Sequence, residues 1–294
     1  MSSFKIALAQ YPIDFFENFE GYTRKISGWV SEAAGQGAKL LVFPEYGSME
    51  LISLLPENVR SDLKKSVDEM QAFWPKVQEL HSQLAQKYDV YILGASFPVE
   101  RKNTAALYAP NGKTGLQDKC IMTRFEREEW EINSGAGLKF FDTDLGKIGI
   151  SICYDAEFPL LTRAMVEAGA DLILVPSCTD TLAGYNRVKI GAQSRALENQ
   201  CYVAQSPTVG NAEWSPATDV NIGAAALYGP PDVGFPDDGI IAQGQLNQSG
   251  WVYADVNMSK ISSVRRHGRV LNHLHWQEQG KPLLPRVETI DLRS

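Results

Sequence analysis

The sequence predicts an α/β protein, a four-layer αββα sandwich built from two similar halves. Four short phrases of the first half recur in the same order in the second half. In each half, strand-like segments alternate with helix-like ones, and the strand-like segments are apolar on both faces, as in sheets that helices cover. Two such sheets bury the most apolar surface when they pack against each other with their helices outside.

The repeated phrases mark the expected strands of each half in order. Their closest pair is AALYAP in the first half against AALYGP in the second. The four pairs are Lys5–Gln10 with Lys147–Ile152, Gly37–Pro44 with Gly169–Pro176, Asp89–Gly94 with Gln200–Gln205, and Ala105–Pro110 with Ala225–Pro230. One match can arise by chance, but four in the same order indicate two halves of one design.

Helices are predicted between these strands from apolar residues at helical spacing. In the first half, two such faces are formed by Tyr22, Ile26, Trp29, Val30 and Ala33, and by Val77, Leu80, Leu84 and Tyr88. Each half is therefore expected to run strand, helix, strand, helix, strand, strand.

The halves are expected to fold as a single domain over residues 1–294, because no linker rich in Pro, Gly or Ser separates them. The core covers about residues 4–256. Residues 211–244 are rich in Gly, Pro and Asp and are predicted to form long loops beside the second half's hairpin. The extension 257–294 includes a tail from Lys281 that is expected to be extended and to lie at a subunit interface.

Composition and charge exclude several classes of protein. Of the 294 residues, 44% are hydrophobic and 21% charged, a balance typical of globular chains rather than disordered ones. The net charge of -7 argues against nucleic acid as a partner. No apolar run approaches the roughly 20 residues that span a bilayer, and the start does not resemble a signal peptide. The four cysteines match neither a zinc site nor a disulfide framework, so we expect a cytoplasmic protein with no membrane partner.

Three side chains at predicted strand ends are candidates for chemistry. Glu45 follows the strand that ends at Pro44, Cys153 follows the central strand of the second half, and Lys119 lies in a charged segment upstream. In α/β sheets, functional groups gather where strands end. The residues alone leave ordinary explanations open, since a cysteine at a strand end is commonly a small buried hydrophobe and the two charged residues are commonly solvated.

Three motifs resemble the signatures of the nitrilase superfamily of carbon–nitrogen hydrolases, in the family's order. They are Leu41–Glu45 (LVFPE), Asp118–Lys119 (DK) and Gly146–Asp155 (GKIGISICYD). Supporting matches are Phe158–Pro159, Gly169–Ser177 and Ser194–Asn199. The resemblance covers roughly Phe4 to Val256. It implies an αββα fold, an amidase or N-carbamoyl amidohydrolase branch, a homo-oligomer such as a dimer or larger, and neither cofactor nor metal.

The resemblance also assigns residues. A Glu–Lys–Cys triad falls on Glu45, Lys119 and Cys153, with the cysteine as nucleophile, the glutamate as base and the lysine beside the developing oxyanion. A second family glutamate has four candidates here, Glu126, Glu128, Glu129 and Glu131. By its distance to Gly135, Glu128 fits best, and it is expected to hold Lys119 or the substrate amine.

Three further residues are expected to bind substrate. The backbone N–H of Tyr154 is placed to assist Lys119 at the oxyanion. Arg124 can bind a substrate carboxylate, although a surface ion pair explains it equally well. Cys178 follows the second-half strand near the expected rim of the pocket.

The predicted activity is hydrolysis of a carbon–nitrogen bond in a small amide through a thioester, with release of ammonia or an amine. The alternative substrate is an N-carbamoyl compound. Nitrile hydrolysis is less favoured, because that branch has Trp-Glu after the nucleophile where this chain has Tyr154-Asp155.

The sequence leaves two alternative functions open. A Cys–His hydrolase would use His267, His273 or His275, which follow Cys153 in the chain but lie in a polar segment. Two of these histidines without a third ligand are weak evidence for a metal. A non-catalytic binding protein of the same fold would be expected to lack a triad residue, and none is lacking here.

Overall fold

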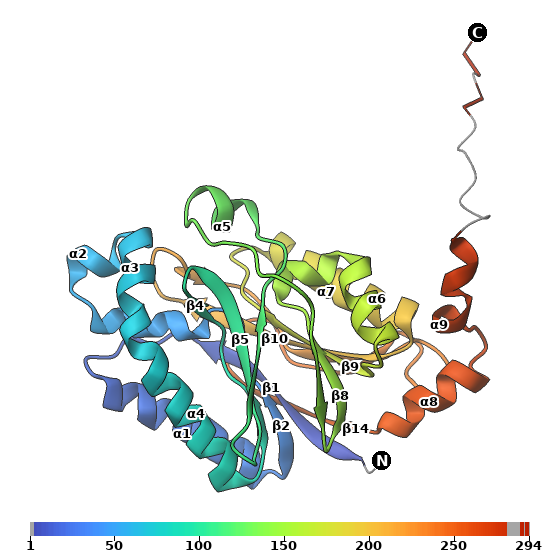
Figure 1. Ribbon diagram of the computed structural model, residues 1–294, viewed down its shortest axis with the longest axis horizontal. Coiled ribbons are helices and arrows are strands. Elements are labelled where there is room, and N and C mark those ends of the chain that lie inside the picture. Colours follow the sequence, from blue (N-terminus) through green and yellow to red (C-terminus); the bar gives the residue numbers. More distant parts are fainter. Residues whose placement is uncertain (1–2, 281–288, 291, 294) are drawn as a thin grey trace.

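The computed structural model describes residues 3–280, 289–290 and 292–293. Two sheet faces lie against each other at its centre, with α1 (Phe19–Gly35) and α4 (Trp74–Tyr88) outside one and α6 (Pro159–Glu167) and α7 (Leu182–Asn199) outside the other. Figure 1 shows these as four layers from left to right. The predicted αββα sandwich is confirmed.

The first half holds six strands, and the second half holds eight. Those of the first half are β1 (Phe4–Pro12), β2 (Ala38–Val42), β3 (Tyr91–Leu93), β4 (Phe97–Val99), β5 (Lys102–Tyr108) and β6 (Thr114–Asp118). Those of the second half, all within the described residues, are β7 (Phe140–Thr143), β8 (Gly146–Ile150), β9 (Leu172–Ser177), β10 (Tyr202–Asn211), β11 (Val220–Asn221), β12 (Ala226–Tyr228), β13 (Ile240–Gln243) and β14 (Gly250–Val256).

The other helices connect or flank these layers. The α-helices are α2 (Glu57–Arg60), α3 (Leu63–Glu69), α5 (Arg124–Glu128), α8 (Met258–His267) and α9 (Asn272–His275). The 3₁₀ helices are η1 (Gly47–Leu54), η2 (Met70–Phe73), η3 (Cys153–Glu157) and η4 (Trp276–Gln279).

The strand order is β4-β5-β3-β2-β1-β10-β9-β8-β7. The two halves join where β1 runs parallel to β10, through only two residue pairs, Tyr11 with Thr208 and Pro12 with Val209. A second connection is the antiparallel pairing of β14 with β1 along seven residue pairs, from Phe4 opposite Val256 to Gln10 opposite Gly250. The last strand of the second half therefore completes the sheet of the first.

The side chains of each strand point alternately to the two faces of the sheet, and this places them in different layers. In β1, Ile6 and Leu8 face the core that also contains second-half strand residues, whereas Ala7 and Ala9 face the helices of their own half. Successive side chains of a strand point to opposite faces, and here both faces are covered. This is why the strand segments read as apolar throughout.

Side-chain caps fix the starts of α1 and α7. Asn18 accepts the N–H of Gly21 at the start of α1, and Thr181 accepts the N–H of Gly184 at the start of α7. Such caps satisfy donors that the helix itself leaves free. In α1, Tyr22, Ile26, Val30 and Ala33 are buried, as the spacing predicts, while Trp29 is partly buried.

The region predicted as loops, 211–244, is mostly irregular but contains the short strands β11, β12 and β13. Beyond β14, α9 and η4 pack on α6 of the same chain. The Arg163 guanidinium of α6 donates to the carbonyl of His273 in α9 at 3.1 Å and lies 4.9 Å from the ring centre of Trp276 in η4. The tail from Lys281, expected at a subunit interface, lies largely outside the described residues, so that expectation stays a prediction.

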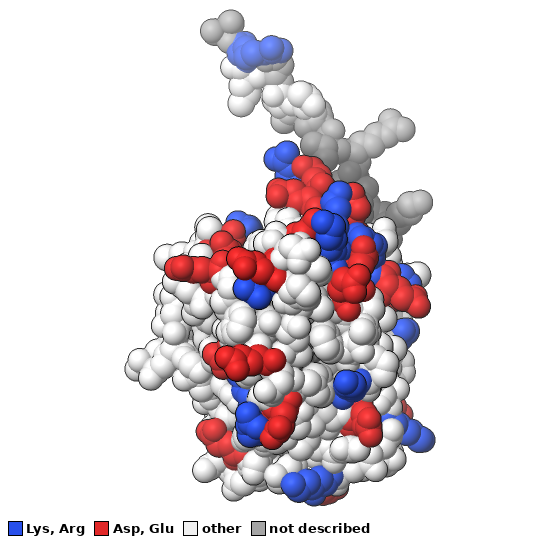
Figure 2. Space-filling model, turned by 90° about the vertical axis from the view of Figure 1, so that its left-hand side faces the viewer, with Lys and Arg blue, Asp and Glu red and all other residues white. Residues whose placement is uncertain are grey.

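Charges on the face of the first-half helices are mixed. Lys and Arg lie among Asp and Glu there and form no broad basic area on this face (Figure 2). Ion pairs such as Arg24–Glu20, with 2.7 Å between nitrogen and oxygen, are exposed. Among the helices of the described residues, none combines the length and apolar character that crossing a membrane requires.

Candidate active site

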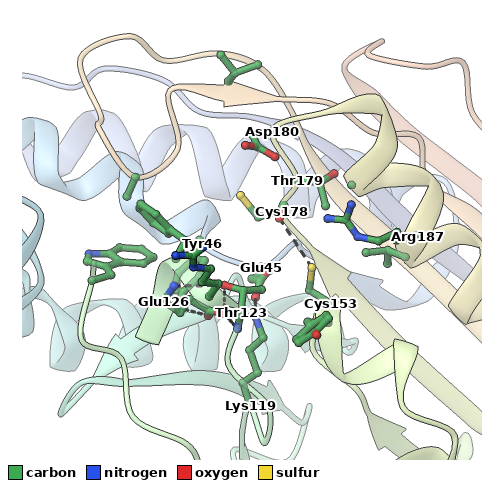
Figure 3. A pocket seen from close by; sticks show the side chains of 18 of the residues that line it. Glu45, Tyr46, Lys119, Thr123, Glu126, Cys153, Cys178, Thr179, Asp180 and Arg187 are labelled. Atoms are coloured by element: carbon green, nitrogen blue, oxygen red, sulfur yellow. Dashed lines mark hydrogen bonds and ion pairs between the residues drawn. The ribbon is translucent and has the colours of Figure 1, made fainter. Parts of the chain in front are cut away.

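Glu45 lies at the turn that follows β2. Its side chain is 2% exposed, and the next residue, Tyr46, has a φ of 52° and is the N-cap of η1. A positive φ is costly for a bulky residue and is kept where the surroundings impose it. Here the Ser96 Oγ accepts the Tyr46 N–H at 2.9 Å. The strained turn directs the Glu45 carboxyl into a cavity between the two halves (Figure 3).

Cys153 lies in the second half, three residues after β8. It is buried and has a φ of 48° at the start of η3. Its Sγ lies 3.8 Å from the backbone oxygen of Cys178 and points into the same cavity (Figure 3). A sharp, strained turn from strand to helix is a known way of exposing a nucleophile at a sheet edge.

Lys119 directly follows β6 and is 1% exposed. Its Nζ lies 2.8 Å from Oε1 of Glu45 and 2.7 Å from Oε2 of Glu126. The backbone N–H of Lys119 donates to the carbonyl of Asn103 at 2.8 Å. Lys119 is therefore a buried cation held between two buried carboxylates (Figure 3).

The glutamate on α5 that contacts Lys119 is Glu126, so the expectation that Glu128 holds Lys119 is wrong. Glu128 lies at the surface, with its side chain 57% exposed and Oε2 2.7 Å from Nε of Arg124. Glu126 is buried, and it forms a capping box with Thr123 at the start of α5, in which Oε2 accepts the Thr123 N–H at 2.9 Å. The T-x-x-E pattern of Thr123–Glu126 is the sequence signal that distinguishes it.

The environment shifts the pKa values of this cluster in opposite directions. Burial raises the pKa of Glu45, even though Lys119 acts against that rise. Burial also tends to raise the pKa of Glu126, but Lys119 and the hydrogen bonds from Thr123 outweigh it and hold the pKa below its usual value. Burial alone would lower the pKa of Lys119, yet the two carboxylates keep it well above its usual value.

Burial and the nearby Glu45 carboxylate raise the pKa of the Cys153 thiol well above its usual value, with Lys119 acting in the other direction. The resting site therefore holds a protonated thiol beside a carboxyl whose own pKa is raised. Such a carboxyl is suited to accept the thiol proton when sulfur attacks a substrate.

A cavity of about 370 Å³ contains these groups and is large enough for a small molecule. Tyr154, Arg124 and Cys178 line it, as the sequence predicts, although Arg124 has a side chain that is 87% exposed and paired with Glu128. In the described part of the chain, no histidine lines the cavity, so the Cys–His alternative has no partner for Cys153.

Three residues near the site were not assigned a role from the sequence. Asn103 on β5 donates to Oε1 of Glu45, and Arg187 on α7 reaches the cavity, 3.7 Å from Glu157 (Figure 3). Asp155 accepts the N–H groups of Cys120 and Ile121 at 3.1 and 2.8 Å, which anchors the segment after Lys119, and burial raises its pKa to about 6. Asp155 belongs to the same motif as Cys153, and this is a signal in the sequence that could have identified it. Asn103 and Arg187 lie outside the motifs, and no signal in the sequence marks them.

Comparison with known proteins decides the family. The family model described as carbon-nitrogen hydrolase matches residues 5–266. This chain belongs to that family.

This carbon–nitrogen hydrolase is similar to the "Probable hydrolase YhcX" of Bacillus subtilis, with 34% identity over 90% of the chain, and it spans about half (52%) of the length of that relative. It is 27% identical to the human "Omega-amidase NIT2" over 90% of the chain and 93% of the relative. The Nit3 structure from Saccharomyces cerevisiae, a member of the nitrilase superfamily, superposes with a TM-score of 0.72 at 22% identity, covering 90% of this chain and 93% of Nit3. The predicted superfamily is confirmed, and the structural likeness confirms the fold.

Proposed function

We propose that this carbon–nitrogen hydrolase cleaves a small amide through a thioester on Cys153. The observation that carries the proposal is the meeting of the buried side chains of Glu45, Lys119 and Cys153, from three separate segments, in one cavity. Similarity to omega-amidases supports an amide as substrate. An amide is a poor electrophile, and its hydrolysis benefits from division into two acyl transfers.

In the first transfer, Sγ of Cys153 attacks the carbonyl carbon while the thiol proton passes to Glu45. The tetrahedral intermediate carries its negative charge on oxygen beside the Lys119 ammonium and the backbone N–H of Tyr154. A donor of this kind is commonly worth about 3 kcal/mol of barrier. When the carbon–nitrogen bond breaks, Glu45 returns the proton to the leaving nitrogen, and ammonia or an amine departs.

In the second transfer, water replaces the amine. Glu45 removes a proton from the water as its oxygen attacks the thioester carbon, and the same oxyanion donors stabilise the new intermediate. The carbon–sulfur bond then breaks, the proton returns to sulfur and the carboxylic acid leaves. Glu126 holds Lys119 in place through both steps without exchanging a proton.

Two opposite charges on the wall of the cavity, Arg187 and Glu157, are relevant to which amide the enzyme binds. Arg187 and Glu157 face each other loosely at 3.7 Å, which leaves the guanidinium able to bind a carboxylate on the substrate. This favours ω-amides of small acids. Ammonia release from a panel of ω-amides, aliphatic amides, N-carbamoyl compounds and nitriles tests the choice, and preference for N-carbamoyl compounds would contradict it.

The mechanism is tested on the same panel with variants. We expect Cys153→Ala to abolish turnover, and Glu45→Gln and Lys119→Ala each to lower kcat by several orders of magnitude. Cys120→Ala is the matched control, because Cys120 does not line the cavity, and its turnover should stay near that of wild type. Mass spectrometry of a reaction stopped by acid should find the acyl group on Cys153. Near-normal turnover of Cys153→Ala would overturn the proposal.

A further inference from the structure

Asn103 contacts every member of the buried Glu–Lys–Glu cluster. It lies on β5 with 0% exposure. Its Nδ2 is 2.8 Å from Oε1 of Glu45 and 3.3 Å from Oε1 of Glu126. Its backbone carbonyl accepts the N–H of Lys119 at 2.8 Å. We infer that Asn103 is a positioning residue that aims Glu45 at Cys153, an inference that rests on the proposed function.

The orientation of the amide is fixed by charge. Turning the side chain about its last bond would bring its carbonyl oxygen against two carboxylate oxygens, which repel it. In the orientation observed, Oδ1 is buried without a hydrogen-bond partner among the described residues. A buried acceptor without a hydrogen bond lowers the stability of the folded protein. Such a cost at Oδ1 is expected where Nδ2 of the same amide has a function.

The neutral amide of Asn103 holds the two carboxylates together better than a second cation would. Glu45 and Glu126 share one ammonium, and their like charges tend to push the two side chains apart. A neutral donor between the two Oε1 atoms draws them together and leaves the net charge of the cluster unchanged. A further lysine or arginine there would lower the pKa of Glu45 and weaken it as a base.

The contacts also give the two carboxylate oxygens of Glu45 different roles. Within the described chain, the hydrogen bonds from Lys119 and Asn103 both end on Oε1. Two donors on one oxygen fix the rotation of the carboxyl about its last bond. Oε2 then stays available to take the proton of Cys153.

The first test is Asn103→Leu, which keeps the size of the side chain and removes its donors. The carboxylate form of Glu45 loses one donor, so its pKa rises and the acidic limb of the kcat/KM profile moves to higher pH. Because a misaligned base slows the chemical step, we expect kcat to fall by about 10- to 100-fold with little change in KM.

Thr104→Val is the matched control. Thr104 is the next residue of β5, equally buried, and its hydroxyl donates to Asp118 at 2.8 Å instead of to the cluster. This variant should keep the wild-type pH profile. A merely structural role of Asn103 would affect both variants alike, through a lower melting temperature and a smaller active fraction, without moving the acidic limb.

The outcomes separate this inference from the proposed function. A wild-type acidic limb and wild-type kcat in Asn103→Leu would overturn the positioning role and leave the proposed hydrolase intact. An enzyme that acts on no member of the panel would instead overturn the proposed function. If Asn103→Leu does not fold, Asn103→Gln decides, because it keeps the amide but moves it by one methylene: a lowered kcat at unchanged KM supports the inference, and a wild-type kcat contradicts it.

Discussion

The chemistry of the site follows from two glutamates with unequal surroundings. Glu126 accepts hydrogen bonds from Lys119, Thr123 and Tyr46, and these donors hold its pKa below the usual value. Glu45 accepts fewer, is fully buried, and its pKa is raised. When environments push the pKa values of two carboxyl groups apart, the pair divides into a fixed charge and a proton carrier. In the proposed mechanism, Glu126 is therefore the fixed charge and Glu45 carries the proton.

The two neighbouring glutamates on α5 provide a direct test at this scale. Glu126→Gln removes the charge that holds Lys119 in place, so we expect kcat/KM for the best amide of the panel to fall by roughly 10²–10³-fold. Glu128→Gln changes an exposed ion pair with Arg124, and such pairs contribute little. Its kcat/KM should stay within about twofold of wild type. The reverse order of effects would contradict the assignment of Glu126.

His81 makes stability depend on pH. It is 1% exposed, its Nδ1 lies 2.8 Å from the Val77 oxygen, and its ring stacks on Tyr108. Burial lowers its pKa to about 4 from an ordinary 6.5. The folded state therefore binds a proton less readily than the unfolded chain. The resulting stability is fully present above pH 6.5 and is lost as pH falls toward 4, by roughly 3 kcal/mol in total.

His81→Gln removes this titration and keeps a polar side chain. We expect the free energy of unfolding of wild type, relative to that of the variant, to decrease as pH falls from 6.5 to 4.5. Urea unfolding followed by circular dichroism at several pH values measures it. Parallel pH dependences in the two proteins would show that His81 is not protonated on unfolding.

At the scale of elements, the sequence predicted those helices and strands that depend on residues close together in the chain. Apolar runs predicted the strands, and the spacing of apolar residues predicted the first-half helices. The family motifs at strand ends named Glu45, Lys119 and Cys153, which line one cavity, while their catalytic roles stay a prediction. The pairing of β14 with β1 and the contact of Asn103 with Glu45 were not predictable, because each depends on register between distant segments. The choice of Glu128 failed for a related reason. Position relative to Gly135 does not tell which side of α5 faces the core.

The turn between β4 and β5 carries avoidable strain. Its two central residues, Glu100 and Arg101, have φ values of 47° and 56°, as in a type I′ hairpin turn. Asn tolerates this conformation better than Glu does. We expect Glu100→Asn to stabilise the protein by about 0.5–1 kcal/mol, measured by urea unfolding. Glu100→Val, with a β-branched side chain, should destabilise it, and equal effects of the two variants would contradict the strain argument.

For the whole molecule, the central core joins the two halves. One continuous cluster of buried apolar residues includes Leu8 and Val42 from the first half and Ile150 and Leu174 from the second. Ser206 of β10 also donates to the carbonyl oxygens of Ala9 and Val42 at 2.6 and 2.8 Å, across the junction of the halves. The cavity lined by Glu45, Lys119 and Cys153 lies between the halves, so the candidate site exists only when both are folded together.

This shared core predicts a single unfolding transition. Leu8→Ala and Leu174→Ala each remove a fully buried side chain, one from each half, and each should cost about 2–5 kcal/mol. Because the two leucines belong to one cluster, each variant should shift the whole urea transition, and tryptophan fluorescence and far-ultraviolet circular dichroism should change together. Two separate transitions, with Leu8→Ala moving only one of them, would mean that the repeated halves fold as independent domains.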